Sequence, residues 1–241
     1  SVTLDPSGRI PTILTVPKIE GLPNEDSYCR SFRGIHALSD GASVSFDSES
    51  WSRMLVRRYV KDPEFGDDWL IAAAAEFSRL YERESLPWMQ QAAFDRGSFA
   101  SLLGVRVEEQ GNRIRLLAIG DSLAVLCDGD KIKMTFPYAS AEEFDRAPRL
   151  LSTNLTENRF LAKAKPGELV TEWSFDGLEQ PALLCMTDAL GHWLLSHRDR
   201  RKSPVAALRS LGTQAEFTRF VQAERAAGRL RRDDTTLMAI W

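Results

Sequence analysis

Cysteine is scarce in this chain, and the few cysteines present are not arranged as a site. The 241 residues contain only three, at Cys29, Cys127 and Cys185. Their odd number and wide separation argue against a disulfide framework, and the lack of a C-x-x-C spacing argues against the common zinc sites. Isolated cysteines inside strand-like stretches are typical of reduced core residues, so we expect a cytoplasmic protein.

Long apolar runs and a dominant charge sign are also missing. No apolar stretch approaches the roughly 18 residues needed to cross a bilayer. The 31 Lys and Arg residues nearly balance the 34 Asp and Glu residues, and the formal net charge of −3 gives no electrostatic reason to bind nucleic acid. We therefore expect neither a membrane nor a nucleic acid as a partner.

Internal repeats and low-complexity tracts are absent as well, and the length fits a single domain over residues 1–241. Residues 1–23 are punctuated by prolines and predict a loop-rich lead-in with one edge strand. The later elements come in blocks rather than in β-α alternation, which favours an antiparallel α+β fold. The expected helices span 48–60, 67–84, 203–211 and 214–227. The expected strands span 27–32, 35–39, 98–108, 113–119, 123–128, 131–135, 181–187 and 234–241, with hairpin turns at 110–112 and 128–130.

What the chain does have is an aspartate at the mouth of each of four apolar stretches. Asp40, Asp121 and Asp188 each follow such a stretch, and Asp233 precedes the last one, next to Asp234. A carboxylate at the mouth of a buried strand is costly to desolvate without a partner, and one metal ion can pair with several carboxylates. If the four mouths converge, they form an oxygen-rich cage suited to Mg²⁺ or Mn²⁺ and to hydrolysis at phosphorus.

Each of these acids also has a simpler explanation, because aspartate is common in turns and helix caps. Taken singly, Asp40, Asp188 and Asp233 are more often turn residues than ligands, and Asp121 can belong to a plain hairpin. Asp234 is a better candidate for a capping neighbour than for a ligand. Only the ordered set favours metal binding.

The set grows to five ordered motifs when the acidic element Asn24-Glu25-Asp26 is included. The other four are Asp40-Gly41, Gly120-Asp121-Ser122, Thr187-Asp188-Ala189 and Asp233-Asp234. In this order and at these spacings the motifs resemble the landmarks of the metal-dependent protein phosphatases of the 2C type, the PPM family. The resemblance covers residues 24–236, and the lack of long inserts is similar to the compact bacterial members.

The resemblance implies a four-layer α-β-β-α sandwich, two antiparallel sheets flanked by helix pairs, with a two-metal site at one end of the sheets. By motif match, Asp40 would bridge two Mn²⁺ or Mg²⁺ ions. The other implied ligands are the Gly41 carbonyl, Asp188, Asp233 and, directly or through water, Glu25 or Asp26. Asp121 together with Asp188 would form a weaker third metal position.

The activity implied by the resemblance is dephosphorylation of serine and threonine in phosphoproteins. A hydroxide bridging the metals would attack phosphorus in line, with Asp40, Asp188 and Asp233 as the catalytic residues. The implied partners are a phosphorylated protein substrate and a cognate serine/threonine kinase.

The chain departs from the family pattern where the substrate would bind. The family's phosphate-clamping Arg, four residues before the Glu of the acidic pair, is here Gly21. The His that some members place after Asp-Gly as a general acid is Ala42. These changes alter substrate handling more than the metal ligands.

Three basic side chains are candidates for compensating these losses. His192 replaces the acid usually found four residues after the third Asp, and a helix starting at Asp188 would turn it toward the site. Arg30 or Arg33 is a candidate phosphate clamp, because a guanidinium binds phosphate in a bidentate manner. A surface position is the simpler explanation for His192, and only proximity in sequence supports Arg30 and Arg33.

Two other functions stay open. The first is a regulatory or binding module that keeps the acids but has weak or no turnover, which Gly21 and Ala42 favour. The near-complete set of mutually repulsive carboxylates favours the enzyme instead. The second is a metal-dependent hydrolase of small phosphate esters, which would show little preference for phosphopeptides over nucleotides.

Overall fold

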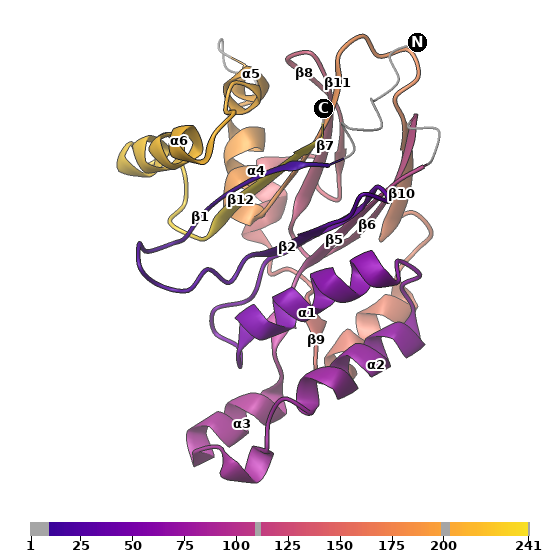
Figure 1. Ribbon diagram of the computed structural model, residues 1–241, viewed down its shortest axis with the longest axis vertical. Helices are drawn as coiled ribbons and strands as arrows, with labels where there is room; N and C mark the ends of the chain where they lie inside the picture. The colour runs from indigo at the N-terminus through magenta and orange to yellow at the C-terminus, as the bar shows by residue number, and fades with distance from the viewer. Residues whose placement is uncertain (1–9, 109–111, 199–202, 241) are drawn as a thin grey trace.

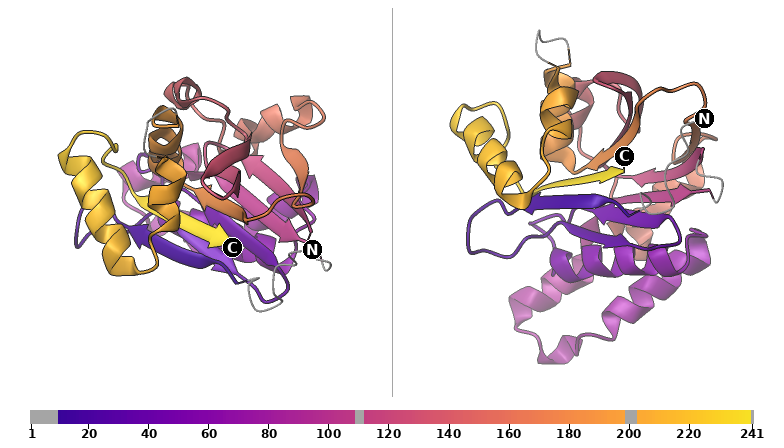
Figure 2. Two further views of the ribbon diagram at one scale, coloured as in Figure 1. Left: turned by 90° about the horizontal axis from the view of Figure 1, so that it is seen from above. Right: turned by 45° about the horizontal axis from the view of Figure 1, so that its top comes forward.

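Two antiparallel sheets packed face to face form the centre of the molecule, and helices cover their outer faces (Figure 1). The computed structural model describes residues 10–108, 112–198 and 203–240. The views in Figure 2 show the layer order of helices, sheet, sheet and helices. The α-β-β-α sandwich expected from the sequence is confirmed.

The first sheet has five strands in the order β1-β12-β11-β7-β8. Their bounds are Thr12–Val16 (β1), Thr235–Ile240 (β12), Pro181–Met186 (β11), Leu123–Asp128 (β7) and Lys131–Phe136 (β8). Every residue of β11 and β12 is buried, as their continuous apolar sequences predict for central strands. Strand β1 confirms the edge strand expected in the lead-in.

The second sheet also has five strands, in the order β10-β6-β5-β3-β2. Their bounds are Val170–Ser174 (β10), Arg113–Ile119 (β6), Leu102–Val107 (β5), Ile35–Ser39 (β3) and Ser27–Arg30 (β2). A short pair, β4 (Phe99–Ala100) and β9 (Leu151–Ser152), lies beside it. The β6–β7 connection, which carries Asp121, passes from the second sheet to the first.

Helices from two separate parts of the chain cover the two sheets. The first sheet is covered by α4 (Asp188–Ser196), α5 (Pro204–Arg209) and α6 (Gln214–Ala226), and the second by α1 (Ser48–Lys61) and α2 (Asp67–Ser78). The remaining elements are α3 (Trp88–Arg96) and the 3₁₀ helices η2 (Arg83–Ser85), η3 (Ala141–Asp145) and η4 (Leu155–Lys163). In the part of the chain that the structure describes, no helix is long and apolar enough to cross a bilayer.

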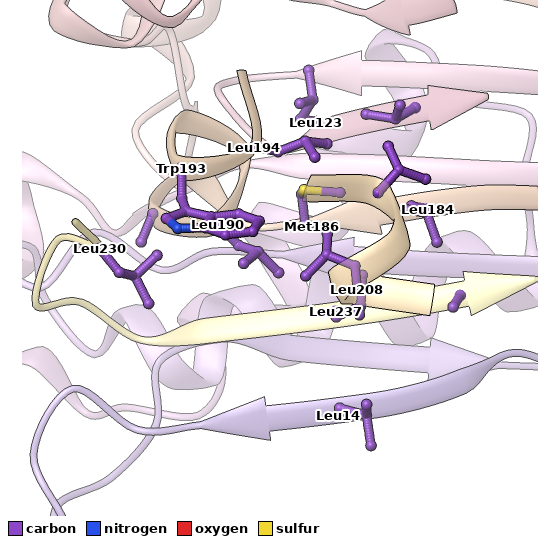
Figure 3. Close-up of a cluster of buried hydrophobic side chains, with 14 of the residues drawn as sticks. Leu14, Leu123, Leu184, Met186, Leu190, Trp193, Leu194, Leu208, Leu230 and Leu237 are labelled. Carbon is purple, nitrogen blue, oxygen red and sulfur yellow. The ribbon is translucent and has the colours of Figure 1, made fainter. Parts of the chain in front are cut away.

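Three apolar layers separate the four layers of secondary structure. Alternation along β5 shows how they are built, because Leu102 packs with the α1–α2 side while Leu103 packs between the sheets. Figure 3 shows the third layer, where Leu190 and Trp193 of α4 pack over Met186 of the first sheet. Each fully buried leucine contributes about 1.5–3 kcal/mol relative to an exposed one.

The largest differences from the expected elements lie between residues 67 and 111. The helix expected over 67–84 ends at Ser78, and α3 was not expected, since none of its residues is fully buried and its apolar pattern is weak. The strand expected over 98–108 is divided at Ser101, whose backbone N–H donates to the Asp40 carbonyl. The turn expected at 110–112 includes residues 110 and 111, which lie outside the described residues.

Candidate functional site

The acidic motifs lie at one edge of the two sheets, because each motif adjoins a strand that begins or ends there. In the second sheet, the end of β3 lies beside the starts of β2 and β5, and β5 begins opposite the end of β6. In the first sheet, Met186 at the end of β11 lies opposite Leu123 and Leu237, at the starts of β7 and β12. The residues just beyond these ends are Asp26, Asp40, Asp121, Asp188 and Asp233. We call this group the acid cluster.

Asp26 is the most buried member of the acid cluster. Its Oδ2 accepts hydrogen bonds from Thr236 Oγ1 at 2.6 Å and from Thr187 Oγ1 at 3.1 Å. No donor among the described residues reaches its buried Oδ1. Burial raises the pKa of Asp26 well above its usual value, and the charges of Asp234 and Asp188 raise it further.

The other carboxylates lie close enough to raise one another's pKa values. Burial and then the charges of Asp26 and Asp188 raise the pKa of Asp40 well above its usual value. The pKa of Asp121 is raised to about 7, by burial and then by Asp188 and Asp233. The pKa of Asp188 is raised by burial and by Asp233, although a hydrogen bond with Asp40 opposes that rise. Burial is the largest cause of each rise, and repulsion between neighbouring carboxylates adds to it.

The two adjacent acids before β12 have different contacts. Asp234 is buried, and its carboxylate accepts the backbone N–H groups of Lys18 at 2.5 Å and Glu25 at 2.6 Å. Asp233 is 43% exposed at its side chain and pairs with Lys18 Nζ at 3.2 Å. Asp234 therefore anchors the loop that contains Lys18 and Glu25, while the charge of Asp233 acts on Asp40, Asp121 and Asp188.

Glu25 turns away from the acid cluster although it neighbours Asp26. Its carboxylate accepts hydrogen bonds from the hydroxyl groups of Ser43 and Ser48. Adjacent residues in an extended chain point to opposite sides, so only one of Glu25 and Asp26 can face the cluster directly. The structure brings Asp26 there and uses Glu25 to tie two loops together.

Two glycines allow the backbone to approach closely at this edge. A Cβ at Gly41 would lie 2.9 Å from the Ser48 carbonyl oxygen and 3.0 Å from that of Glu25. Gly120 has a φ of +101°, and a Cβ there would lie 2.7 Å from Ser101 Cβ. Any other residue at these positions would push apart the segments that carry Asp40 and Asp121.

Ser101 is a residue of this edge that the sequence did not reveal. Its Oγ accepts the backbone N–H of Asp40 at 2.9 Å and lies 2.8 Å from Ser122 Oγ. It thereby links the loops that hold Asp40 and Asp121. The only sequence signal for it is a small polar residue inside an otherwise apolar strand.

Neither arginine considered from the sequence reaches the acids. Strands β2 and β3 pair so that Arg30 lies opposite His36, while Ser27 and Ser39 mark the end that carries the acids. Arg30 donates to the Pro11 carbonyl at 3.0 Å, and Arg33 lies in the turn at the remote end of this hairpin. The structure thus does not bring a phosphate clamp from either position.

His192 lies at the rim, against η3, rather than among the acids. Its ring is 6.1 Å from that of Phe144, and burial followed by the nearby Arg231 lowers its pKa. Arg231 pairs with Asp145 at 2.7 Å and its charge also acts on Asp188. Arg231 belongs to the basic run 229–232, for which the sequence most simply predicts a solvated face, and the structure places it where its charge acts on Asp188.

The donor chemistry of the acid cluster fits hard divalent cations. It offers carboxylate oxygens, a buried Asp26 Oδ1 with no partner among the described residues, and carboxyl groups whose pKa values are raised by burial and by one another's charges. As placed, no three His, Cys, Asp or Glu side chains within residues 10–108, 112–198 and 203–240 are arranged to hold a metal ion. Metal binding therefore requires the carboxylates to turn toward a common point.

The fold is that of the PPM-type serine/threonine phosphatases of bacteria. A bacterial serine phosphatase superposes with a TM-score of 0.62 at 12% identity, over 95% of this chain and 96% of that one. The catalytic domain of the phosphatase PstP, solved with two manganese ions, gives 0.57 at 16% identity, over 95% and 96%. The PPM Ser-Thr phosphatase MsPP from Mycobacterium smegmatis, in complex with cacodylate, gives 0.56 at 19% identity, over 100% and 99%.

Sequence comparison alone does not reveal this relationship. No protein-family model matches the chain, and no curated protein matches its sequence. At identities of 12% to 19% the property shared with the solved structures is the fold. The resemblance expected from the five motifs is confirmed at that level.

Proposed function

We propose that this protein is a metal-dependent phosphatase acting on phosphorylated serine or threonine in proteins. The observation that supports this most is the meeting of five carboxylates from five separate segments at one edge of a phosphatase-type sandwich. Their mutual repulsion makes the free energy of folding less favourable, and bound cations would remove that repulsion. Structural acids gain nothing from such an arrangement.

In this proposal Asp40, Asp188 and Asp233 hold two Mn²⁺ or Mg²⁺ ions, with Asp26 and the Gly41 carbonyl beside them and Asp121 at a weaker third position. When bound, such ions lower the pKa of a coordinated water and neutralise the oxygens of a phosphoryl group. Glu25, which the motif match also gave as a possible ligand, instead holds Ser43 and Ser48 through hydrogen bonds to its carboxylate.

The residues around the acid cluster orient and position its members. Thr187 and Thr236 fix one oxygen of Asp26 and leave the other free to face a cation. Ser101 sets the backbone of Asp40. At the rim, Lys18 and Arg231 are the cations that meet an incoming phosphate ester, and both already pair with carboxylates there.

Hydrolysis assays test this proposal directly. Purified protein is given an aryl phosphate and a phosphothreonine peptide, each with EDTA, Mg²⁺ or Mn²⁺, beside an Asp188→Ala variant. We expect turnover that depends on metal, disappears in EDTA and is lost in the variant. Metal-independent turnover, or full activity in Asp188→Ala, would contradict the proposal.

A second candidate is a phosphatase-fold binding module with weak or no turnover. The side chains as placed are not arranged as a three-ligand set among the described residues, and Gly21 and Ala42 replace substrate-handling residues. This candidate predicts Mn²⁺ binding by calorimetry together with no hydrolysis of any phosphate ester in the same assays.

A further inference from the structure

A groove with a volume of about 480 Å³ opens beside the acid cluster. One wall is the loop between β1 and β2, which contributes Ile19, Leu22 and Pro23. The other wall is the segment 43–49, which includes the first two residues of α1. Glu25 and Asp234 also line the groove, and Lys18 of its lining pairs with Asp233 of the acid cluster. Its volume lies in the range of sites that hold a ligand.

Specific hydrogen bonds build both walls. Asp234 accepts the backbone N–H groups of Lys18 and Glu25, which lie at the two ends of the first wall. Within that wall, the Leu22 N–H donates to the Ile19 carbonyl at 3.2 Å and closes a turn. The Glu25 carboxylate spans the groove to Ser43 and Ser48 of the other wall. The groove is therefore formed before any ligand binds.

The first wall presents apolar side chains to solvent. Ile19 is 49% exposed and Leu22 is 56% exposed, although both belong to a loop that is held in place. A ligand that covers them gains roughly 25 cal/mol for each Å² of apolar surface removed from water. The wall thus favours an apolar side chain of a ligand.

The charged lining groups are mainly acidic. Four carboxylates line the groove against the single cation Lys18, namely Glu25, Asp47, Glu49 and Asp234. Asp47 accepts hydrogen bonds from the Ser50 N–H and the Tyr81 hydroxyl. Glu49 pairs with Arg53 of its own helix and keeps 35% of its side chain exposed. The surplus of negative charge favours a cationic group in the ligand and disfavours an acidic one.

We propose that this groove binds the stretch of a phosphoprotein next to its phosphorylated residue, and selects an apolar residue together with a basic one. The inference rests on the proposed phosphatase function. Leu22 and Ile19 would cover the apolar residue, and Glu49 would pair with the basic one. Lys18 lines the groove and pairs with Asp233, so this ion pair links the groove to the acid cluster. A peptide bound in the groove would therefore have its phosphate beside the acid cluster.

Two phosphothreonine peptides of equal length test the inference, one flanked by Leu and Arg and the other by Ser and Glu. With Mn²⁺, we expect kcat/KM for the Leu/Arg peptide to exceed that for the Ser/Glu peptide by about tenfold. Leu22→Ser and Glu49→Gln should each reduce this preference by about threefold, through KM. Hydrolysis of an aryl phosphate, which is too small to fill the groove, should stay unchanged in both variants. Leu80→Ser, a change of an exposed leucine on another face, is the matched control.

Equal kcat/KM for the two peptides, or a preference that survives in the double variant Leu22→Ser/Glu49→Gln, would overturn the inference. Aryl phosphate turnover would then still support the proposed function. If no substrate is hydrolysed, the proposed function fails, and fluorescence anisotropy with labelled copies of the same peptides tests the groove alone. In that measurement we expect the Leu/Arg peptide to bind more tightly than the Ser/Glu peptide. Equal binding of the two peptides would show that the groove is not a selective peptide-binding site.

Discussion

Thr236 Oγ1 lies 2.6 Å from Asp26 Oδ2, although 210 residues separate them in the sequence. Thr187 Oγ1 approaches the same oxygen at 3.1 Å. These two bonds tie the first acidic motif to the last two and fix the orientation of the Asp26 carboxylate. Its Oδ1 is left without a donor among the described residues, which is the geometry expected of an oxygen reserved for a cation.

Thr236→Val removes the shorter of these bonds while keeping the shape of the side chain. We expect Mn²⁺ affinity to fall about tenfold, because groups that orient a metal ligand are typically worth that much. The free energy of unfolding should fall by about 1–2 kcal/mol, since a buried acceptor loses a donor. Calorimetry and chemical denaturation measure the two effects. Thr171→Val in β10 is the control, and an unchanged Mn²⁺ affinity in Thr236→Val would refute the orienting role.

Asp40→Asn should raise the stability of the metal-free protein while lowering its metal-dependent turnover. It removes one charge from a group of repelling carboxylates, so the metal-free variant should be more stable than the parent by about 1 kcal/mol. Metal-dependent turnover should fall by more than about 100-fold, because a proposed shared ligand is lost. Thermal unfolding in EDTA and an aryl phosphate assay measure both. Asp130→Asn, on an exposed turn, is the control, and retained turnover in Asp40→Asn would exclude the two-metal assignment.

The metal-free protein should become more stable as the pH falls from about 8 to about 5.5. The pKa of Asp121 is raised from 3.8 to about 7, so the folded state binds a proton more tightly than the unfolded chain. The stability from this group is fully present below pH 3.8 and is lost as the pH rises through about 7. The raised pKa values of Asp26 and Asp40 act in the same direction.

The midpoint temperature of unfolding in EDTA across this pH range measures the effect. His192, whose pKa is lowered, acts in the opposite direction below its usual pKa, so the difference between variants is the informative quantity. Asp121→Asn should flatten the pH dependence, and saturating Mn²⁺ should reverse it. An equal slope in the parent and in Asp121→Asn would show that Asp121 is not the responsible group.

Arg231→Ala should weaken the binding of phosphate esters. Arg231 is placed beside Asp188 by its ion pair with Asp145, and a guanidinium there can meet a phosphate. We expect KM for an aryl phosphate to rise by about threefold to tenfold with a smaller change in kcat, and Arg231→Lys to recover part of the loss. Arg232→Ala is the neighbouring control. A KM that is unchanged in Arg231→Ala would leave Lys18 as the cation to examine.

The sequence was most informative where a residue type and a strand end coincide. An apolar stretch followed by aspartate predicted that Asp40, Asp121 and Asp188 follow strand ends. The ends of β3 and β6 share one edge because both strands run antiparallel to β5, which lies between them. The sequence favoured Asp26 over Glu25 only slightly, since the choice depends on which side of the chain faces the first sheet. The two threonines that hold Asp26 could not be found either, because their roles arise from contacts across 161 and 210 residues.

The elements that the sequence missed have weak local signals. Helix α3 has no fully buried residue, so its sequence lacks the apolar periodicity that predicts an amphipathic helix. The break at Ser101 follows from its bonds to the Asp40 loop, which only the folded chain contains. Arg30 and Arg33 were considered for their closeness in sequence to the acidic motif, but the β2–β3 hairpin carries them to its other end.

Diffraction from a crystal grown with Mn²⁺, recorded at the manganese absorption edge, tests the central claim most directly. The claim is that the acid cluster is a metal centre. It predicts anomalous peaks at the edge where the two sheets meet, with Asp40, Asp188 and Asp233 as ligands and Asp26 Oδ1 turned toward them. A map from fully loaded crystals with no peak among these carboxylates would contradict the claim.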